Sequence, residues 1–162
     1  MTKTLIVMRH AKSSWSDPGL PDIDRPLNDR GRASARAIGE WLRFGQFNPD
    51  LALISNSRRT SQTWEETGLS AETRFLPELY HAAAETILRA LRGAQGDCVM
   101  VLGHNPGIGD FAARILGVAP SHDRFMDYPT ASTLVATIHG PWDELDWHSA
   151  RTRAFTVPRD LT

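Results

Sequence analysis

The chain has 162 residues, of which 41% are hydrophobic and 23% charged, with a formal net charge of −1 and one cysteine. This length suits one domain, residues 1–162, with a substantial core, and the near-neutral charge argues against nucleic acid or an anionic membrane as a partner. Cys98 has no second cysteine to pair with, and no apolar run resembles a signal peptide or a membrane span, so we expect a cytoplasmic protein.

The first expected strand is the apolar run of residues 5–8, which ends at Arg9 and His10. An uninterrupted apolar run of this length is typical of a strand buried on both faces, as in a parallel sheet covered by helices. Ligands bind at the carboxyl edge of such sheets, so a guanidinium and an imidazole there are candidates for binding an anion. Taken alone, the pair would fit a merely solvated strand end equally well.

A long loop rich in proline and aspartate follows, residues 12–27, and loops of this length inside a compact domain are often functional. We then expect Asn28 to cap a helix that ends at Gly45. A second apolar run, residues 51–54, leads into a polar stretch and a helix of weak apolar periodicity that stops at Gly68.

The second half of the chain continues the alternation of strands and helices. One helix ends at Gly93, and another is expected to begin with Asn105 as its cap and Pro106 at its first position. His104 follows the most convincing buried strand. The expected extended segments are residues 73–76, 98–102, 133–138 and 154–157. The alternation predicts an α/β fold with a mainly parallel central sheet.

If the strands that precede His10 and His104 are neighbours, the two histidines face each other across one crevice. Arg9 and one of Arg58 or Arg59 would make this crevice positive, and guanidinium groups match the oxygens of a phosphate. A neutral imidazole that donates one N–H to a backbone carbonyl can attack phosphorus with its other nitrogen. The cluster therefore predicts phosphoryl transfer through a phosphohistidine on His10.

The histidines do not follow the spacing of a metal site, because the chain has no H-x-H, H-E-x-x-H or Cys/His ligand pattern. We therefore expect no metal and no other cofactor. His122, His139 and His148 are interpreted as surface residues. His81 is kept as a candidate for the edge of the site, and Trp15 lies on the loop beside the expected nucleophile.

Three motifs occur in order along the chain: Arg9-His10, Ser55-x-x-x-Arg59-x-x-Gln62-Thr63 and Gly103-His104. Together they resemble the histidine phosphatase superfamily, which includes phosphoglycerate mutases and acid phosphatases. The shortness of the chain and its residues 9–15 and 24–27 are most similar to the SixA-type phosphohistidine phosphatases. The resemblance covers residues 3 to about 117 and implies a phosphoglycerate mutase-like fold, a three-layer α/β/α sandwich.

The resemblance also implies roles for particular residues. It places the nucleophile at His10, a flanking arginine at Arg9, a second arginine at Arg59 and a second histidine, which contacts the phosphoryl group, at His104. The residues expected to bind substrate beside them are Lys12, Ser13, Arg58 and Asn105. The family's glycine after the nucleophile is Ala11 here, which is compatible with the loop if its φ is negative.

The proton donor for the leaving group is open. Many members of the superfamily use a carboxylic acid after the third strand, where this chain offers Glu78, although an exposed strand-end residue is an equal interpretation. Asp22 and Asp24 are further candidates if the loop folds over the site. A phosphohistidine substrate relaxes the requirement, because its second ring nitrogen can take a proton from solvent and the imidazole leaves neutral.

These observations predict a metal-independent phosphatase that forms a phosphohistidine intermediate on His10. The leading substrate is a phosphorylated protein with a phosphohistidine domain, in a signalling phosphorelay. One alternative is a phosphatase of small phosphate esters. The other is a catalytically silent phosphate-binding domain, which would apply if the candidate residues did not converge.

Overall fold

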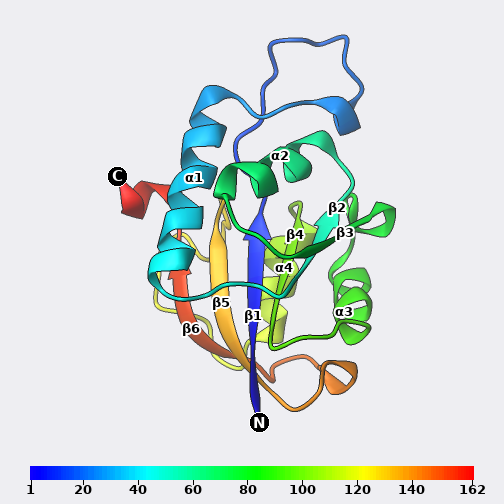
Figure 1. The fold of residues 1–162 in the computed structure, drawn as a ribbon, viewed down its shortest axis with the longest axis vertical. Helices are drawn as coiled ribbons and strands as arrows, with labels where there is room; N and C mark the ends of the chain where they lie inside the picture. Colours follow the sequence, from blue (N-terminus) through cyan, green and yellow to red (C-terminus); the bar gives the residue numbers. More distant parts are fainter.

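Six strands form one mixed sheet in the order β3-β2-β4-β1-β5-β6 in the computed structural model, which describes residues 1–162 (Figure 1). The strands are β1 (Thr2–Arg9), β2 (Leu51–Ser55), β3 (Glu72–Leu76), β4 (Cys98–Gly103), β5 (Thr133–His139) and β6 (Arg151–Thr156). The first four run parallel to one another, whereas β5 is antiparallel to β1 and β6 is antiparallel to β5. The prediction of a mainly parallel sheet is confirmed.

Four α-helices cover the two faces of this sheet and make the expected three layers. They are α1 (Asp29–Phe44), α2 (Arg58–Thr67), α3 (Ala84–Arg92) and α4 (Gly107–Ile115). The hydrophobic core is split accordingly: one cluster joins the sheet to α1 and α2, and the other joins it to α3 and α4. None of the helices is long and apolar enough to cross a membrane.

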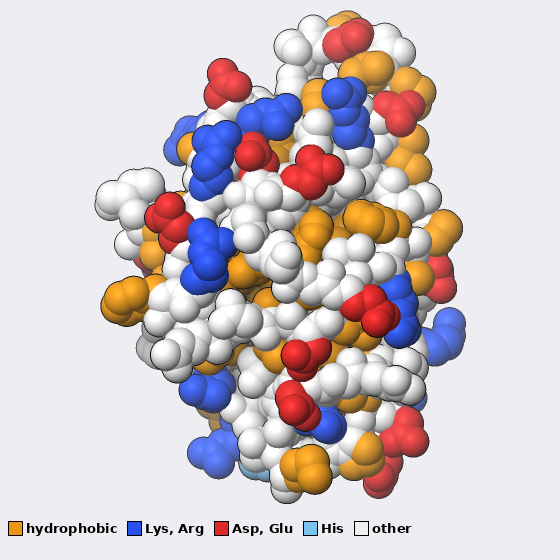
Figure 2. Space-filling model, viewed as in Figure 1, with side chains coloured by type: hydrophobic (Ala, Val, Ile, Leu, Met, Phe, Trp, Pro, Cys, Tyr) orange, Lys and Arg blue, Asp and Glu red, His pale blue; other side chains and the backbone are white.

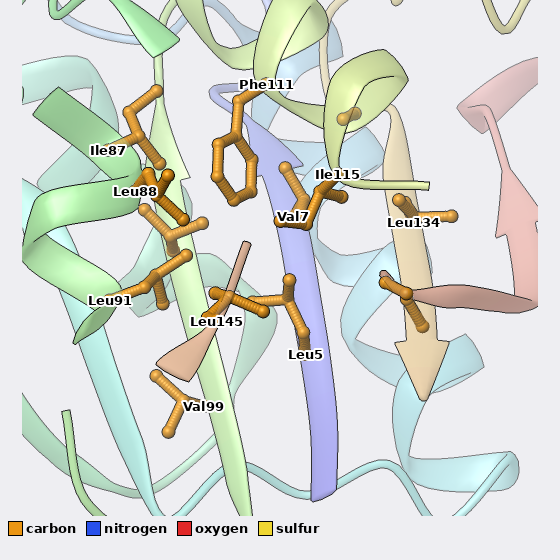
Figure 3. Packing of buried hydrophobic residues seen from close by; sticks show 14 of the residues in the cluster. Leu5, Val7, Ile87, Leu88, Leu91, Val99, Phe111, Ile115, Leu134 and Leu145 are labelled. Carbon is orange, nitrogen blue, oxygen red and sulfur yellow. The ribbon is translucent and has the colours of Figure 1, made fainter. Parts of the chain in front are cut away.

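Strand β1 lies at the centre of both clusters because its side chains alternate between the two faces. Ile6 and Met8 pack toward α1 and α2, while Leu5 and Val7 pack toward α3 and α4, and all four are fully buried. Figure 3 shows Val7 close to Phe111 of α4. Burial of each such side chain contributes about 1.5–3 kcal/mol. The strand that leads to His10 is therefore fixed from both sides.

Helix α2 forms although its sequence has little apolar periodicity. The Ser57 side chain caps it by accepting from the Thr60 N–H at 3.2 Å, and Gly68 ends it with a φ of 69°. Between these ends, Trp64 packs into the cluster beneath α1 and α2. Capping and one large anchor replace the apolar stripe that the sequence lacks.

Several element boundaries differ from the predictions by one to three residues, including the start of β1 at Thr2 where the strand was expected from residue 5. Helix α4 begins at Gly107, so Pro106 precedes the helix and does not occupy its first position. Pro106 is therefore the N-cap, and Asn105 lies one residue before it, although the Asn105 side chain still accepts from the Gly109 N–H in the first turn at 3.1 Å. At the end of the chain, β6 covers Arg151–Thr156 and begins before the expected 154–157, because its pairing with β5 continues past a register shift.

Candidate active site

The carboxyl ends of β1 and β4 meet at one edge of the sheet, because the two strands pair in parallel with Arg9 opposite Gly103. His10 and His104 leave these strands side by side, with ring centroids 5.2 Å apart, as predicted. A cleft of about 270 Å³ opens beside them. It is lined by Arg9, His10, Lys12, Ser13, Trp15, Asp22, Arg25, Arg59, His81, His104, Asn105 and Thr130.

The His10 ring is held in one tautomer. Its Nδ1 lies 2.7 Å from the carbonyl oxygen of Ala11, which can only accept, so Nδ1 carries the proton and Nε2 keeps its lone pair. The side chain is 7% exposed, and burial, assisted by the charges of Arg9 and Arg59, lowers the pKa of His10 to about 3. At neutral pH the ring is an uncharged base with a free nitrogen.

Contacts from two helices fix the backbone after His10. The Ala11 N–H donates to Thr63 Oγ1 at 3.0 Å, and that hydroxyl donates to the Arg59 carbonyl at 2.7 Å. Ala11 is not among the residues with positive φ, so alanine fits where the family has glycine. On the other side, α1 approaches so closely that a Cβ at Gly31 would lie 2.1 Å from the Lys12 carbonyl oxygen. Glycine is required there for steric reasons.

His104 is also buried and neutral. Its Nδ1 lies 3.4 Å from Arg59 Nη2, which can only donate, so Nε2 carries the proton and donates to Ser55 Oγ at 2.8 Å. Burial, together with the fields of His10 and Arg59, lowers the pKa of His104 to about 2. Ser55 thus orients the second histidine.

Arg9 and Arg59 bring two guanidinium groups to the cleft, and each has an N–H donor without a hydrogen-bond partner. Arg9 Nη1 donates to the Tyr128 carbonyl at 3.2 Å, and Arg59, in the first turn of α2, is only 1% exposed. The Nε of each arginine is buried without a hydrogen-bond partner. Burial, and secondarily the charge of Arg59, lowers the pKa of Arg9. Buried donors of this kind suit a bound anion.

The loop of residues 12–27 does fold over the cleft, and it brings Asp22 to Arg59. Arg59 Nη1 donates to the Asp22 carbonyl at 2.7 Å, and Nη2 contacts its carboxylate at 3.0 Å. The same carboxylate accepts from the Tyr80 hydroxyl and lies 3.1 Å from His81 Nε2. These hydrogen bonds, that of Tyr80 above all, hold the pKa of Asp22 well below its usual range. A carboxylate of the chain itself, that of Asp22, therefore occupies part of the surface that would bind an anion.

Arg25 was not predicted as a site residue, yet its side chain lines the cleft and contacts several other residues of the loop. It is 7% exposed, donates to Ser13 Oγ at 2.8 Å and to Asp22 Oδ1 at 3.2 Å, and stacks on the Trp15 ring at 3.5 Å. Its position between Asp24 and Pro26 marks a stretch that resembles the SixA type, but no periodicity in the loop indicates where the side chain points.

Tyr128 is the second residue that the sequence did not reveal. Its hydroxyl donates to the Val7 carbonyl at 2.6 Å, while its own carbonyl accepts from Arg9 and from Asn105 Nδ2, the latter at 3.0 Å. The residue has a φ of 46°, in the left-handed region that few non-glycine residues adopt. Tyr128 thereby orients Arg9 toward the cleft.

Two candidate residues, Glu78 and Arg58, lie outside the cleft, and a third, Asn105, lines it with its amide already engaged. Glu78 is exposed in the short turn η2 (Pro77–Leu79) and does not line the cleft. Arg58 is exposed and donates to the Asp24 carbonyl at 3.4 Å. Asn105 borders the cleft, but its amide is engaged with backbone groups, including the Tyr128 carbonyl.

Of the remaining predicted residues, some line the cleft and one lies outside it. Lys12 and Ser13 line the cleft, although Ser13 already accepts a hydrogen bond from Arg25. His81 lines it as predicted, with its ring centroid 4.8 Å from that of His104. Asp24 is exposed and outside it.

The chain holds no group of three or more His, Cys, Asp or Glu side chains arranged to bind a metal ion. Burial, with the charge of Asp50 adding to it, raises the pKa of the Cys98 thiol to about 12. The thiol is therefore un-ionised at neutral pH and unsuited to act as a nucleophile. The chemistry of the cleft rests on its histidines, arginines and one carboxylate.

Comparison with known proteins agrees with this geometry. The profile of the histidine phosphatase superfamily (branch 1) matches residues 5–80. The uncharacterized protein Rv1276c of Mycobacterium tuberculosis is 33% identical over 159 residues, which cover 94% of this chain and 100% of that protein. The phosphohistidine phosphatase SixA of Escherichia coli is 28% identical over 119 residues, covering 68% of this chain and 73% of its own.

A solved structure extends the similarity to the whole fold. The structure of a protein of Nakamurella multipartitia that is assigned as a phosphohistidine phosphatase SixA superposes on this chain with a TM-score of 0.86 at 29% identity. The match covers 98% of this chain and 97% of that one. The fold is thus phosphoglycerate mutase-like, as the sequence motifs implied.

Proposed function

The chain belongs to the histidine phosphatase superfamily and is a phosphatase, and we propose that it acts without a metal on phosphohistidine carried by a signalling protein, through a phosphoryl intermediate on His10. The observation that carries this proposal is the 2.7 Å contact from His10 Nδ1 to the Ala11 carbonyl. It leaves Nε2 of a neutral ring available for attack, beside two arginines suited to a phosphoryl group.

In the first step, the lone pair of His10 Nε2 forms a bond to phosphorus. The bond between phosphorus and the substrate imidazole breaks, and its electron pair leaves with that imidazole. The phosphorylated His10 ring is then cationic, and its Nδ1–H remains bonded to the Ala11 carbonyl. In the second step water attacks phosphorus, the electron pair returns to Nε2, and the proton of water passes to phosphate or solvent.

Arg9, Arg59 and His104 would stabilise the charge on the transferring group. The unpartnered Nε donors of the two arginines support such a role. His104 carries its proton on Nε2, so it can present a proton on Nδ1 without becoming charged only when Arg59 Nη2 turns from Nδ1 to the phosphoryl group and the Ser55 hydroxyl donates to Nε2. Asp22 must leave Arg59 for the phosphoryl group to enter.

The leaving group favours phosphohistidine over an alkyl phosphate. An alkyl phosphate would expel an alkoxide and needs a general acid, but Glu78 lies outside the cleft and Asp22 is ionised. A phosphohistidine whose second ring nitrogen carries a proton leaves as neutral imidazole and needs no such acid. The cleft has no carboxylic acid to protonate a leaving group, and a phosphohistidine substrate does not need one.

One observation favours the alternative of a small phosphate ester. His81 lines the cleft, its side chain is 49% exposed, and its ring lies against that of His104. A protonated imidazole at this position could donate to an alkoxide. An ester phosphatase would then depend on His81, whereas a phosphohistidine phosphatase would not.

The test is the ratio of kcat/KM for a chemically phosphorylated histidine peptide to that for an alkyl phosphate such as glycerol 1-phosphate, measured with a chelator and with His10→Ala as blank. The proposal expects a ratio well above one, no loss with the chelator, and no phosphate release by His10→Ala. A ratio below one that depends on His81 would establish the ester alternative and refute the proposed substrate.

A further inference from the structure

A second cavity, of about 600 Å³, adjoins the catalytic cleft and is not used by the chemistry proposed above. It shares Lys12 and Thr130 with the cleft. Its walls come from the N-terminal half of α1, the segment before β5 and the C-terminal turn η4 (Pro158–Leu161). We call this cavity the basic groove because four cationic side chains line it.

Four cations line the basic groove: Lys12, Arg30, Arg124 and Arg159. No aspartate or glutamate is among its lining residues, although the chain as a whole has a net charge of −1. Arg124 pairs with Asp127, whereas the other three cations make no ion pair within the chain. Figure 2 shows Lys and Arg side chains over the N-terminal half of α1, which forms one wall, with Asp and Glu side chains beside them. Positive charge is thus concentrated in the groove.

The cations of the groove differ from those of the catalytic cleft. Lys12, Arg30 and Arg159 are exposed and stand on three separate segments, whereas Arg59 in the cleft is 1% exposed. Buried, fixed guanidinium groups suit one compact phosphoryl group. Exposed cations spread over a wide groove suit several carboxylates on a partner surface, which they attract from a distance.

We propose that the basic groove docks an aspartate- and glutamate-rich segment that flanks the phosphohistidine of the protein substrate. The inference rests on the proposed function, since it supplies the part of a protein substrate that lies outside the catalytic cleft. Lys12 and Thr130 border both cavities, so one continuous ligand can occupy the two. The groove would then select among phosphohistidine proteins by the charge around the histidine.

The test compares two synthetic peptides phosphorylated on one histidine, with flanking residues that are either aspartate and glutamate or serine. At low salt we expect kcat/KM to be about tenfold higher for the acidic peptide, through a lower KM at similar kcat, and the preference to shrink as salt is added. In the double variant Arg30→Glu, Arg159→Glu the preference should disappear, while turnover of the serine-flanked peptide is kept.

A matched control is the double variant Arg89→Glu, Arg151→Glu. Both arginines are exposed, make no ion pair, and lie on α3 and β6, outside the groove. It has the same net charge as the groove variant and should retain the preference for the acidic peptide. Loss of the preference in both double variants would reduce the effect to net charge and overturn the docking site.

The outcomes separate the docking site from the activity on which it rests. If both peptides are hydrolysed equally well by the unaltered protein, phosphohistidine remains the substrate and only the docking site is refuted. If neither peptide is hydrolysed while p-nitrophenyl phosphate is, the proposed function itself fails, and the docking inference with it.

Discussion

Lowering the pH from 7 to 5 should destabilise the fold through its two buried active-site histidines. The pKa of His10 is about 3 and that of His104 about 2 in the folded protein, against about 6.5 for histidine in an unfolded chain. Below pH 6.5 the unfolded chain therefore binds protons that the folded protein does not. Stability is present above this value and is lost as the pH falls toward the folded-state pKa.

The size of the effect follows from these values. At pH 5, protonation lowers the free energy of the unfolded chain by about 2.1 kcal/mol per histidine, against about 0.2 kcal/mol at pH 7. Each of the two histidines thus costs about 2 kcal/mol of unfolding free energy between these pH values. Asp22 does not contribute between pH 7 and pH 5. Its pKa is lowered in the folded protein, so the stability that it adds is lost only as the pH falls through the usual aspartate pKa of about 3.9 and below.

The assay is urea denaturation at pH 7 and pH 5 of the unaltered protein, His10→Asn and His104→Gln. The asparagine amide has a donor near the place of Nδ1, and the glutamine amide has one near that of Nε2, so we expect each variant to keep the bond that the histidine makes to Ala11 or Ser55. Each variant should lose about 2 kcal/mol less than the unaltered protein on acidification. The same loss in all three proteins would show that neither ring resists protonation and would refute the reasoning.

The remaining predictions concern the cleft. Arg59→Ala should lower kcat/KM by about 10²–10³-fold while Arg58→Ala changes it less than about twofold, because only Arg59 lines the cleft; the reverse order in steady-state kinetics would move the role to Arg58. Asp22→Asn should strengthen inhibition by inorganic phosphate by up to about fivefold, since it removes a partly exposed ion pair with Arg59; weaker inhibition would mean that Asp22 organises the site. Glu78→Gln should leave hydrolysis of a phosphohistidine peptide unchanged, and a large loss of kcat would identify Glu78 as the missing proton donor.

The convergence of the two histidines could be predicted because it depends on strands. His10 and His104 follow apolar runs buried on both faces, and parallel strands bring their carboxyl ends to the same edge of a sheet. The tautomer of His10 was predictable in kind, since a nucleophilic imidazole needs one pinned nitrogen. Its partner, the Ala11 carbonyl, became known only with the structure.

The contributions of the loop could not be predicted in the same way. Residues 12–27 have no hydrophobic period, so nothing in their order indicates that Arg25 turns inward or that Asp22 reaches Arg59. Asp22 was a candidate donor, but its hydrogen bonds make it an ionised partner of Arg59. Side-chain direction within an irregular loop depends on tertiary contacts.

Glu78 shows the limit of transferring a role by position. The turn η2 buries Leu79 and leaves Glu78 exposed, while Tyr80 and His81, which follow directly, contact Asp22 over the cleft. A shift of a few residues within one turn therefore exchanges the carboxylate for a phenol and an imidazole. The family resemblance pointed to a segment that does border the cleft, but local geometry decides which of its side chains reaches it.

The phosphoryl intermediate on His10 can be tested directly by a rapid-quench experiment with a phosphohistidine peptide in the presence of a chelator, followed by mapping of the phosphorylated residue. We expect an acid-labile, base-stable phosphoryl group on His10 that forms and decays at rates consistent with kcat and is absent from His10→Ala. Turnover of the peptide without phosphorylation of His10, or with the phosphoryl group on another residue, would contradict the proposed mechanism.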